Sequence, residues 1–271
     1  MKRNVFFILA LAGYVWSCST PETPKTTVLN YYTPYNGTPE YLNGQIKSVK
    51  EISYRAIEKD GSFEKGDELT SKELNELGWS VDYITTFDTD GNVVQTKYML
   101  DDNKFNTWDV ESHNGKIVKA TFTRADTVHY YHEIEYIGLN EKISQYSMPN
   151  DELTITYNVE KGENGIYNNK VEWFNPENEL LGYNLFKSDE NGRILGYKRF
   201  NVQDSLTTST ELDYNDKGFF TKQTISDGGG SVSSSIDLQY LTYDELGNWL
   251  TSVGALNNGP KLIFERTYEY Y

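Results

Sequence analysis

The chain has 271 residues, and its 40 acidic against 25 basic residues give a formal net charge of −15 at pH 7. A surface of that sign repels phosphate backbones and anionic headgroups, so we expect no nucleic-acid partner. The whole chain holds a single cysteine, which excludes a disulfide framework and leaves apolar burial to stabilise the fold.

The first residues follow the order of a signal peptide. Lys2 and Arg3 precede an apolar run over residues 5–15, and small residues follow. The run is too short to cross a bilayer as a helix, which needs about 20 residues. We therefore predict that residues 1–17 are a signal peptide that is removed on export.

Val15, Trp16, Ser17 and Cys18 resemble the bacterial lipobox, although Trp16 is bulkier than the residue usual at that position. The resemblance implies that Cys18 carries a diacylglyceryl thioether and that this lipid is the link of the chain to the membrane. It also implies a place in the cell envelope, at the outer membrane, facing either the periplasm or the exterior. The alternative is an ordinary signal peptide that ends near a cysteine by chance.

Residues 19–40 hold four prolines and many Thr and Ser without a sustained period. This composition is typical of an extended linker, so we predict a tether over residues 18–40, including the lipidated cysteine. A single β domain is expected over residues 41–271. The tyrosines near position 32 could instead pack on that domain.

The domain begins with predicted strands over residues 46–56 and 80–87, separated by one short helix. Thr70 and Glu73 have the spacing of a capping box, and Gly78 stands where a helix ends. This helix interrupts the strands early in the domain, so we expect it to plug or cap one end of the fold.

One turn motif recurs along the rest of the chain, at residues 87–93 (FDTDGNV), 188–194 (SDENGRI), 214–220 (YNDKGFF) and 243–249 (YDELGNW). An Asp or Asn side chain can accept a hydrogen bond from a backbone N–H two residues on, and Gly supplies the positive φ that closes a short hairpin loop. The motif therefore predicts structural turns.

Weaker copies of the motif complete a repeat of 24 to 29 residues, marked by Gly91, Gly115, Asn140, Gly165, Gly192, Gly218 and Gly247. Further turn signals lie between the markers, which leaves alternating, aromatic-rich strands of about 8 to 10 residues. We predict an all-β, antiparallel up-and-down meander of about 14 to 16 strands with one short helix, because sheets that wide curl or close. A wide closed barrel is preferred to an open twisted single sheet. Too few residues are apolar for a transmembrane barrel.

The segment Tyr243-Asp244-Glu245-Leu246-Gly247-Asn248-Trp249 resembles the YD repeat of Rhs-type proteins, and most closely its variants in exported lipoproteins of Bacteroidota. The resemblance covers about residues 85–271 in degenerate form. It implies a porin-like, barrel-shaped meander of unknown function. Because Rhs-type relatives are often described as sugar-binding, the resemblance also implies a glycan as one possible class of ligand.

Two further segments, Asp126-Thr127-Val128 and Asp204-Ser205-Leu206, are similar to the O-glycosylation sites of exported Bacteroidota proteins. Both fall on predicted turns of the same rim. Thr127 and Ser205 are therefore candidate glycosylation sites.

Groups suited to catalysis or metal binding are scarce. His129 and His132 are three apart, which in a strand points them to opposite faces, so we expect partly exposed polar residues and no metal site. The Asp-rich turns lack the spacing of a calcium loop, and nucleophile, zinc and phosphate motifs are missing from the sequence. The sequence thus predicts no enzyme and no cofactor.

Three functional hypotheses remain open. The first is a non-catalytic binding or scaffold lipoprotein that engages a glycan or an envelope protein. The second is a carrier whose barrel interior holds an apolar ligand, which contiguous apolar side chains on the inner face would favour and charged ones exclude. The third is a polysaccharide hydrolase, which needs two carboxyl groups about 5 to 10 Å apart in a cleft.

Overall fold

The computed structural model describes residues 26–29, 40–101, 104–162, 169–189, 193–257 and 259–271. The predicted signal peptide, Cys18, most of the predicted tether and the repeat markers Gly165 and Gly192 lie outside these ranges.

Within the described ranges the chain forms one short helix, α1 (Ser71–Glu76), and otherwise strands. The strands are β1 (Thr26–Leu29), β2 (Glu40–Asn43), β3 (Ile46–Lys59), β4 (Ser62–Glu68), β5 (Tyr83–Phe87), β6 (Val93–Met99), β7 (Phe105–His113), β8 (Lys116–Arg124), β9 (Thr127–Ile137), β10 (Asn140–Ser147), β11 (Glu152–Lys161), β12 (Asn169–Phe174), β13 (Leu180–Ser188), β14 (Ile194–Phe200), β15 (Leu206–Tyr214), β16 (Phe220–Asp227), β17 (Val232–Tyr243), β18 (Trp249–Leu256) and β19 (Leu262–Tyr270).

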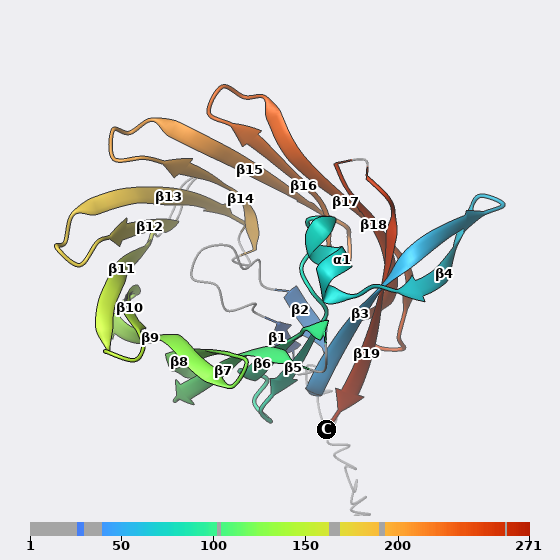
Figure 1. Cartoon of the computed structure of the whole chain (residues 1–271), viewed down its shortest axis with the longest axis horizontal. Coiled ribbons are helices and arrows are strands. Elements are labelled where there is room, and N and C mark those ends of the chain that lie inside the picture. The colour runs from blue at the N-terminus through green and yellow to red at the C-terminus, as the bar shows by residue number, and fades with distance from the viewer. Residues whose placement is uncertain (1–25, 30–39, 102–103, 163–168, 190–192, 258) are drawn as a thin grey trace, which may run out of the picture.

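Sixteen of these strands form a closed antiparallel barrel in up-and-down order (Figure 1). The ring closes where β3 pairs with β19 on one side, as Tyr54 opposite Ile263, and with β5 on the other, as Val49 opposite Thr85. Closure removes the free edges that a sheet this wide would otherwise expose. The predicted all-β closed barrel is confirmed, and the open twisted sheet is not what forms.

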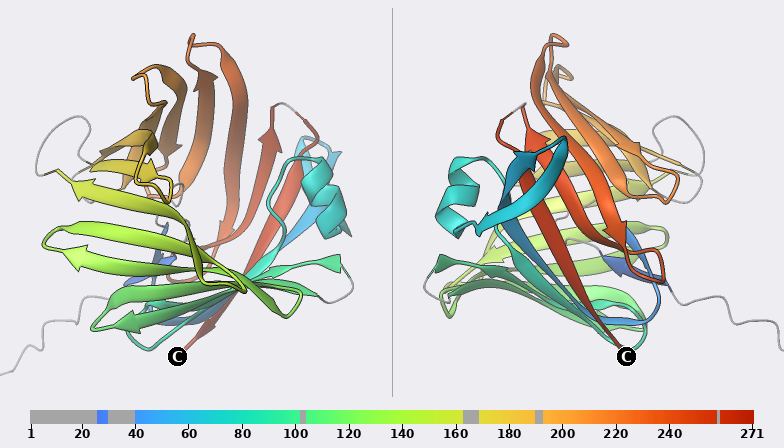
Figure 2. Two further views of the ribbon diagram at one scale, coloured as in Figure 1. Left: turned by 60° about the vertical axis from the view of Figure 1, so that its left-hand side comes forward. Right: turned by 90° about the vertical axis from the view of Figure 1, so that its right-hand side faces the viewer.

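Strand β4 is an addition to the ring. It pairs with the C-terminal half of β3, for example Phe63 opposite Glu58, and the resulting hairpin extends away from the barrel wall (Figures 1 and 2). The chain then returns through α1 to β5, which pairs with the N-terminal half of β3. One long strand therefore serves both the ring and the hairpin.

The N-terminal segment differs from the predicted tether. Residues 26–29 form β1, which pairs antiparallel with β2 as a separate two-stranded sheet, with Val28 opposite Tyr41. Apolar and β-branched residues of this stretch find a partner strand, which an isolated linker lacks. Glu40, assigned to the end of the tether, begins β2, and Leu42 in that strand is fully buried.

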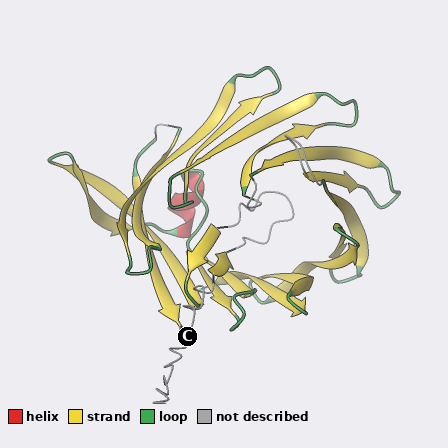
Figure 3. Ribbon diagram, turned by 180° about the vertical axis from the view of Figure 1, so that it is seen from behind, coloured by secondary structure: helices red, strands yellow, loops and turns green. Residues whose placement is uncertain are grey.

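Helix α1 has the predicted caps. The Thr70 side chain accepts a hydrogen bond from the Glu73 backbone N–H (3.2 Å), the Glu73 carboxylate accepts one from the Thr70 N–H (2.9 Å), and Gly78 has a φ of +79°. Leu74 is fully buried, and the ring of Trp79 lies 5.0 Å from that of Phe264 in β19. The helix lies at one end of the ring beside its wall (Figures 2 and 3), so it covers part of that end without filling it.

The recurring turns have the predicted chemistry. In the loop after β17, Asp244 Oδ1 accepts hydrogen bonds from the backbone N–H groups of Leu246 (2.9 Å) and Asn248 (2.8 Å), and Gly247 has a φ of +89°. Asp88 and Asn215 form the same loop. Asn201 and Asp227 repeat the two side-chain hydrogen bonds on the opposite rim, which the sequence marked only as general turn positions.

Tyrosine hydroxyls complete these hairpins. The strand pairing shifts by a bulge next to each of four turns, and a tyrosine of the following strand donates its hydroxyl to a carbonyl just after the turn. The four pairs are Tyr136 with Ile117 (3.0 Å), Tyr214 with Ile194 (2.6 Å), Tyr240 with Phe220 (2.5 Å) and Tyr268 with Trp249 (3.0 Å). Bulges take backbone groups out of the ladder, and buried carbonyls need another donor. Hydrogen bonds to backbone carbonyls therefore account for part of the high tyrosine content.

We predict that Tyr214→Phe destabilises the barrel by about 1 to 3 kcal/mol, because the Ile194 carbonyl loses its donor in a part-buried place. Urea unfolding followed by circular dichroism measures the change. The matched control is Tyr146→Phe, whose ring stacks on Tyr131 and whose hydroxyl makes no hydrogen bond to another described residue, and it should change stability by less than about 0.5 kcal/mol. Equal effects of the two substitutions would contradict the role assigned to the hydroxyl.

Candidate functional site

A cavity of about 400 Å³ lies in the barrel interior beside the seam where the ring closes. It is bounded by the inner face of β15 to β19, the segment after α1, and single residues of β2, β3, β5 and β6. Its lining consists mainly of aromatic and aliphatic side chains: Trp79, Tyr83, Tyr98, Tyr214, Phe220, Ile236, Leu238, Tyr240, Trp249 and Phe264, with Gly78, Ser80, Gly218, Ser252, Glu40, Glu51 and Arg266. This volume lies in the usual range for small-molecule sites.

A second cavity of about 390 Å³ adjoins the first through Phe220, which lines both. Its other lining residues are Phe186, Ile194, Tyr197, Leu212, Gln223 and Ile225, so the polar groups of Tyr197 and Gln223 lie among apolar side chains. Aromatic and aliphatic side chains therefore extend along the inner wall as far as β13, with polar groups among them.

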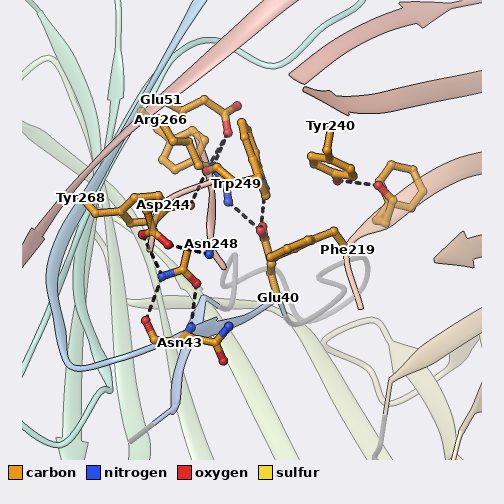
Figure 4. A network of polar contacts seen from close by, with 12 residues as sticks. Glu40, Asn43, Glu51, Phe219, Tyr240, Asp244, Asn248, Trp249, Arg266 and Tyr268 are labelled. Atoms are coloured by element: carbon orange, nitrogen blue, oxygen red, sulfur yellow. Dashed lines mark hydrogen bonds and ion pairs between the residues drawn. The ribbon is translucent and has the colours of Figure 1, made fainter. Parts of the chain in front are cut away.

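Arg266 is the centre of the polar contacts in the first cavity (Figure 4). Its Nη1 lies 2.7 Å from Glu40 Oε1 and its Nε 2.8 Å from Glu51 Oε2. Its Nη2 donates to the Tyr83 hydroxyl (2.8 Å), and the guanidinium lies over the Trp249 ring, 3.9 Å from the ring centroid. Burial alone would lower the pKa of Arg266, but the surrounding groups, Glu40 first, hold that pKa well above its ordinary value.

The Glu40 and Glu51 carboxylates also accept hydrogen bonds from other side chains of the cavity. Glu40 Oε1 accepts a hydrogen bond from Trp249 Nε1 (2.8 Å), and Glu51 Oε2 accepts one from the Tyr83 hydroxyl (3.0 Å). The Glu40 and Glu51 side chains are 18% and 17% exposed, while that of Arg266 is 3% exposed. The guanidinium is thus enclosed, and both carboxylates still reach the cavity.

Strand β2 is positioned for this contact by the YDELGNW turn. The fully buried Asn248 donates through Nδ2 to the Asn43 carbonyl (2.8 Å) and accepts through Oδ1 from the Asn43 N–H (2.7 Å). Asn248 Nδ2 also donates to the Tyr270 hydroxyl, which in turn donates to Asp244. The best copy of the repeat motif therefore holds the N-terminal strand in the barrel (Figure 4).

The candidate sites that the sequence proposed lie elsewhere. Thr127 and Ser205 are exposed at the β8–β9 and β14–β15 turns, on the same rim, and glycosylation of them stays a prediction. Cys18 is outside the described residues.

The two histidines differ from the expectation that both are partly exposed. His129 is exposed, but His132 is only 2% exposed. The His132 ring makes a hydrogen bond with the Gln145 side chain (3.0 Å), and burial lowers the pKa of His132. Among the described residues, no group of three or more His, Cys, Asp or Glu side chains could hold a metal ion.

The cluster around Arg266 was missed from sequence. Glu40 fell in the predicted tether, and Glu51 is one of many acidic residues. The available signal was Arg266 itself, which stands between Phe264 and Tyr268 in an alternating strand. A charge on an otherwise apolar face indicates a buried partner.

Asp82, which does not line the first cavity, is a buried acid with 6% exposure, and it accepts a hydrogen bond from Ser53 Oγ (2.6 Å). Burial raises the pKa of Asp82 to about 6, and the negative charges of Glu51 and Glu68 add to the effect. Its pKa in the unfolded chain is near 4, so between about pH 4 and pH 6 the folded state binds more protons than the unfolded state. Ionised Asp82 therefore destabilises the fold above about pH 6.

We predict that Asp82→Asn stabilises the protein at pH 7 by up to about 3 kcal/mol, because the amide stays neutral and its oxygen can still accept from Ser53. The gain should shrink as pH falls through 6 and vanish near pH 4. Urea unfolding at several pH values measures it, with the exposed Asp67→Asn as control, for which the difference should be small throughout. A gain that does not change with pH would contradict the prediction.

Helix α1, the one helix among the described residues, is neither long nor apolar enough to cross a membrane. No protein-family model matches the chain, so the resemblance to YD repeats stays a prediction, and no curated protein matches the sequence.

Two of the solved structures that match this chain have low sequence identity and TM-scores below 0.5. A porin-like protein from Bacteroides uniformis ATCC 8492 is 11% identical, with 83% of this chain and 96% of that chain covered and a TM-score of 0.49. A domain described as an outer membrane lipoprotein-sorting protein from Vibrio parahaemolyticus is 7% identical, with 83% and 86% covered and a TM-score of 0.23. Likeness at this level carries no argument about function, which has to be inferred from the residues of this chain.

Proposed function

We propose that this chain is a non-catalytic binding lipoprotein of the bacterial cell envelope, anchored through Cys18, whose barrel interior holds a small, largely apolar ligand. The observation that carries the proposal is the mainly aromatic and aliphatic lining of the first interior cavity. Ligand pockets are typically concave and mostly apolar, with a few placed polar groups.

An apolar ligand is favoured over a glycan because most hydrogen-bond donors of the first cavity are already bonded within the protein. The Tyr214 and Tyr240 hydroxyls donate to backbone carbonyls, and the donors of Arg266 go to Glu40, Glu51 and Tyr83. A sugar would need such donors and acceptors for its own hydroxyls. The charged residues gather on one side of the cavity and pair there, so most of the wall stays apolar.

The hydrolase hypothesis gains no support from this arrangement. Glu40 and Glu51 are the carboxylates that line the first cavity, and both converge on the same guanidinium. A glycosidase instead places its two carboxyl groups on either side of a gap that receives the sugar.

Binding is tested with the neutral apolar dye N-phenyl-1-naphthylamine, whose fluorescence rises on entering an apolar site. The purified full chain should bind it, and Leu238→Gln, which places an amide in the cavity wall, should weaken binding by about tenfold or more. The matched control is Leu241→Gln on the same strand, because Leu241 is 38% exposed and does not line the cavity. Dye binding that both substitutions leave unchanged would place the site elsewhere.

Anchoring is tested in the producing cell by Cys18→Ser. Without the thiol no thioether can form, so we expect the protein to move from the membrane fraction to the soluble fraction, as followed by immunoblotting. Attachment of a lipidated protein to a membrane depends on its acyl chains, so a chain without them should leave the membrane fraction almost completely. Retention in the membrane fraction would show that something other than this lipid attaches the chain.

A further inference from the structure

The first cavity carries a surplus of negative charge. Three charged side chains line it, the carboxylates of Glu40 and Glu51 and the guanidinium of Arg266, which gives the lining a formal charge of −1. Asp82 lies close enough for the charge of Glu51 to act on it, and burial together with that charge raises the pKa of Asp82. A low-dielectric interior strengthens any such imbalance.

Arg266 is not free to receive an anionic ligand. Its Nε, Nη1 and Nη2 all donate to groups of the cavity wall, one face lies over Trp249, and its side chain is 3% exposed. The hydrogen bonds that the two carboxylates receive from Tyr83, Trp249 and Arg266 are all accepted by Glu40 Oε1 and Glu51 Oε2. The second oxygen of each carboxylate accepts no hydrogen bond from another described residue, and each side chain retains some exposure.

Aromatic rings form much of the remaining lining, with Trp79, Tyr98, Tyr214, Tyr240 and Phe264 among them. Ring faces attract cations, and the attraction grows when the cation is shielded from water. The Tyr214 and Tyr240 hydroxyls already donate to backbone carbonyls. A ligand in the cavity would therefore meet the rings of these two tyrosines and not a free hydroxyl donor.

We propose that this cavity takes an organic monocation of the ammonium type, whose charge offsets the surplus carboxylate while its alkyl groups lie against the aromatic rings. The inference rests on the proposed function and adds the chemical class of the ligand. A bare metal ion fits less well, because the described residues hold no group of three or more metal-ligating side chains.

The test uses three water-soluble probes of nearly the same shape: choline, its neutral analogue 3,3-dimethylbutan-1-ol and the anion 3,3-dimethylbutanoate. Isothermal titration calorimetry with the full chain should show choline binding at least about tenfold more tightly than the alcohol, with the carboxylate the weakest. An alcohol that binds as well as choline would overturn the cation preference. In that case dye binding in the cavity still supports the proposed function, whereas failure of the dye and of all three probes would sink both.

The substitution Glu51→Gln tests whether the Glu51 carboxylate causes the preference for choline over the neutral alcohol. The amide oxygen can still accept from Arg266 and Tyr83, but the surplus charge is gone, so choline should fall to about the affinity of the alcohol. The control is Glu265→Gln, whose side chain is 41% exposed and pairs with Lys65 outside the cavity, and it should leave the preference intact. Circular dichroism checks the fold of each variant. If Glu51→Gln does not fold, the comparison of the three probes on the unaltered chain decides the proposal by itself.

Discussion

The buried guanidinium of Arg266 joins the parts of this barrel that are most distant in sequence. It sits on β19, the last strand of the ring, and reaches β2, β3 and β5 through Glu40, Glu51 and Tyr83. Closing a ring brings its first and last strands together without a covalent link, so the seam depends on contacts of this kind. Removing one partner of a buried ion pair typically costs about 3 to 5 kcal/mol, since the other charge stays buried and uncompensated.

The remainder of the ring is built from one repeated hairpin, and its parts depend on one another. The Asp or Asn side chain organises the loop, the bulge beside the loop increases the twist that closure requires, and a tyrosine hydroxyl serves a carbonyl next to the bulge. Four of the hairpins are therefore completed by a tyrosine of the strand that follows them. The last such tyrosine, Tyr268, is on β19, which pairs with the first strand of the ring.

Features set by neighbouring residues could be predicted from sequence, and those set by distant ones could not. The turn at Asp244 and the caps of α1 depend on residues within four positions of one another, and both are as predicted. The number of strands favoured closure, although an open twisted sheet stayed the alternative. The contact of Glu40 with Arg266 spans 226 positions, and nothing local distinguishes Glu40 from the other acidic residues of the chain. The hydrogen bonds from tyrosine hydroxyls beside the bulges were missed for a related reason, because aromatic residues are frequent in any strand.

Glu40 belongs to β2 and not to the ring, so the binding cavity is shared between the barrel and the segment that leads back toward Cys18. A ligand that contacts Glu40 also favours the docked position of β2, and by thermodynamic linkage a force that draws β2 outward weakens the hold on the ligand. In the proposed lipoprotein, tension along the chain between Cys18 and the barrel would then act as a negative effector.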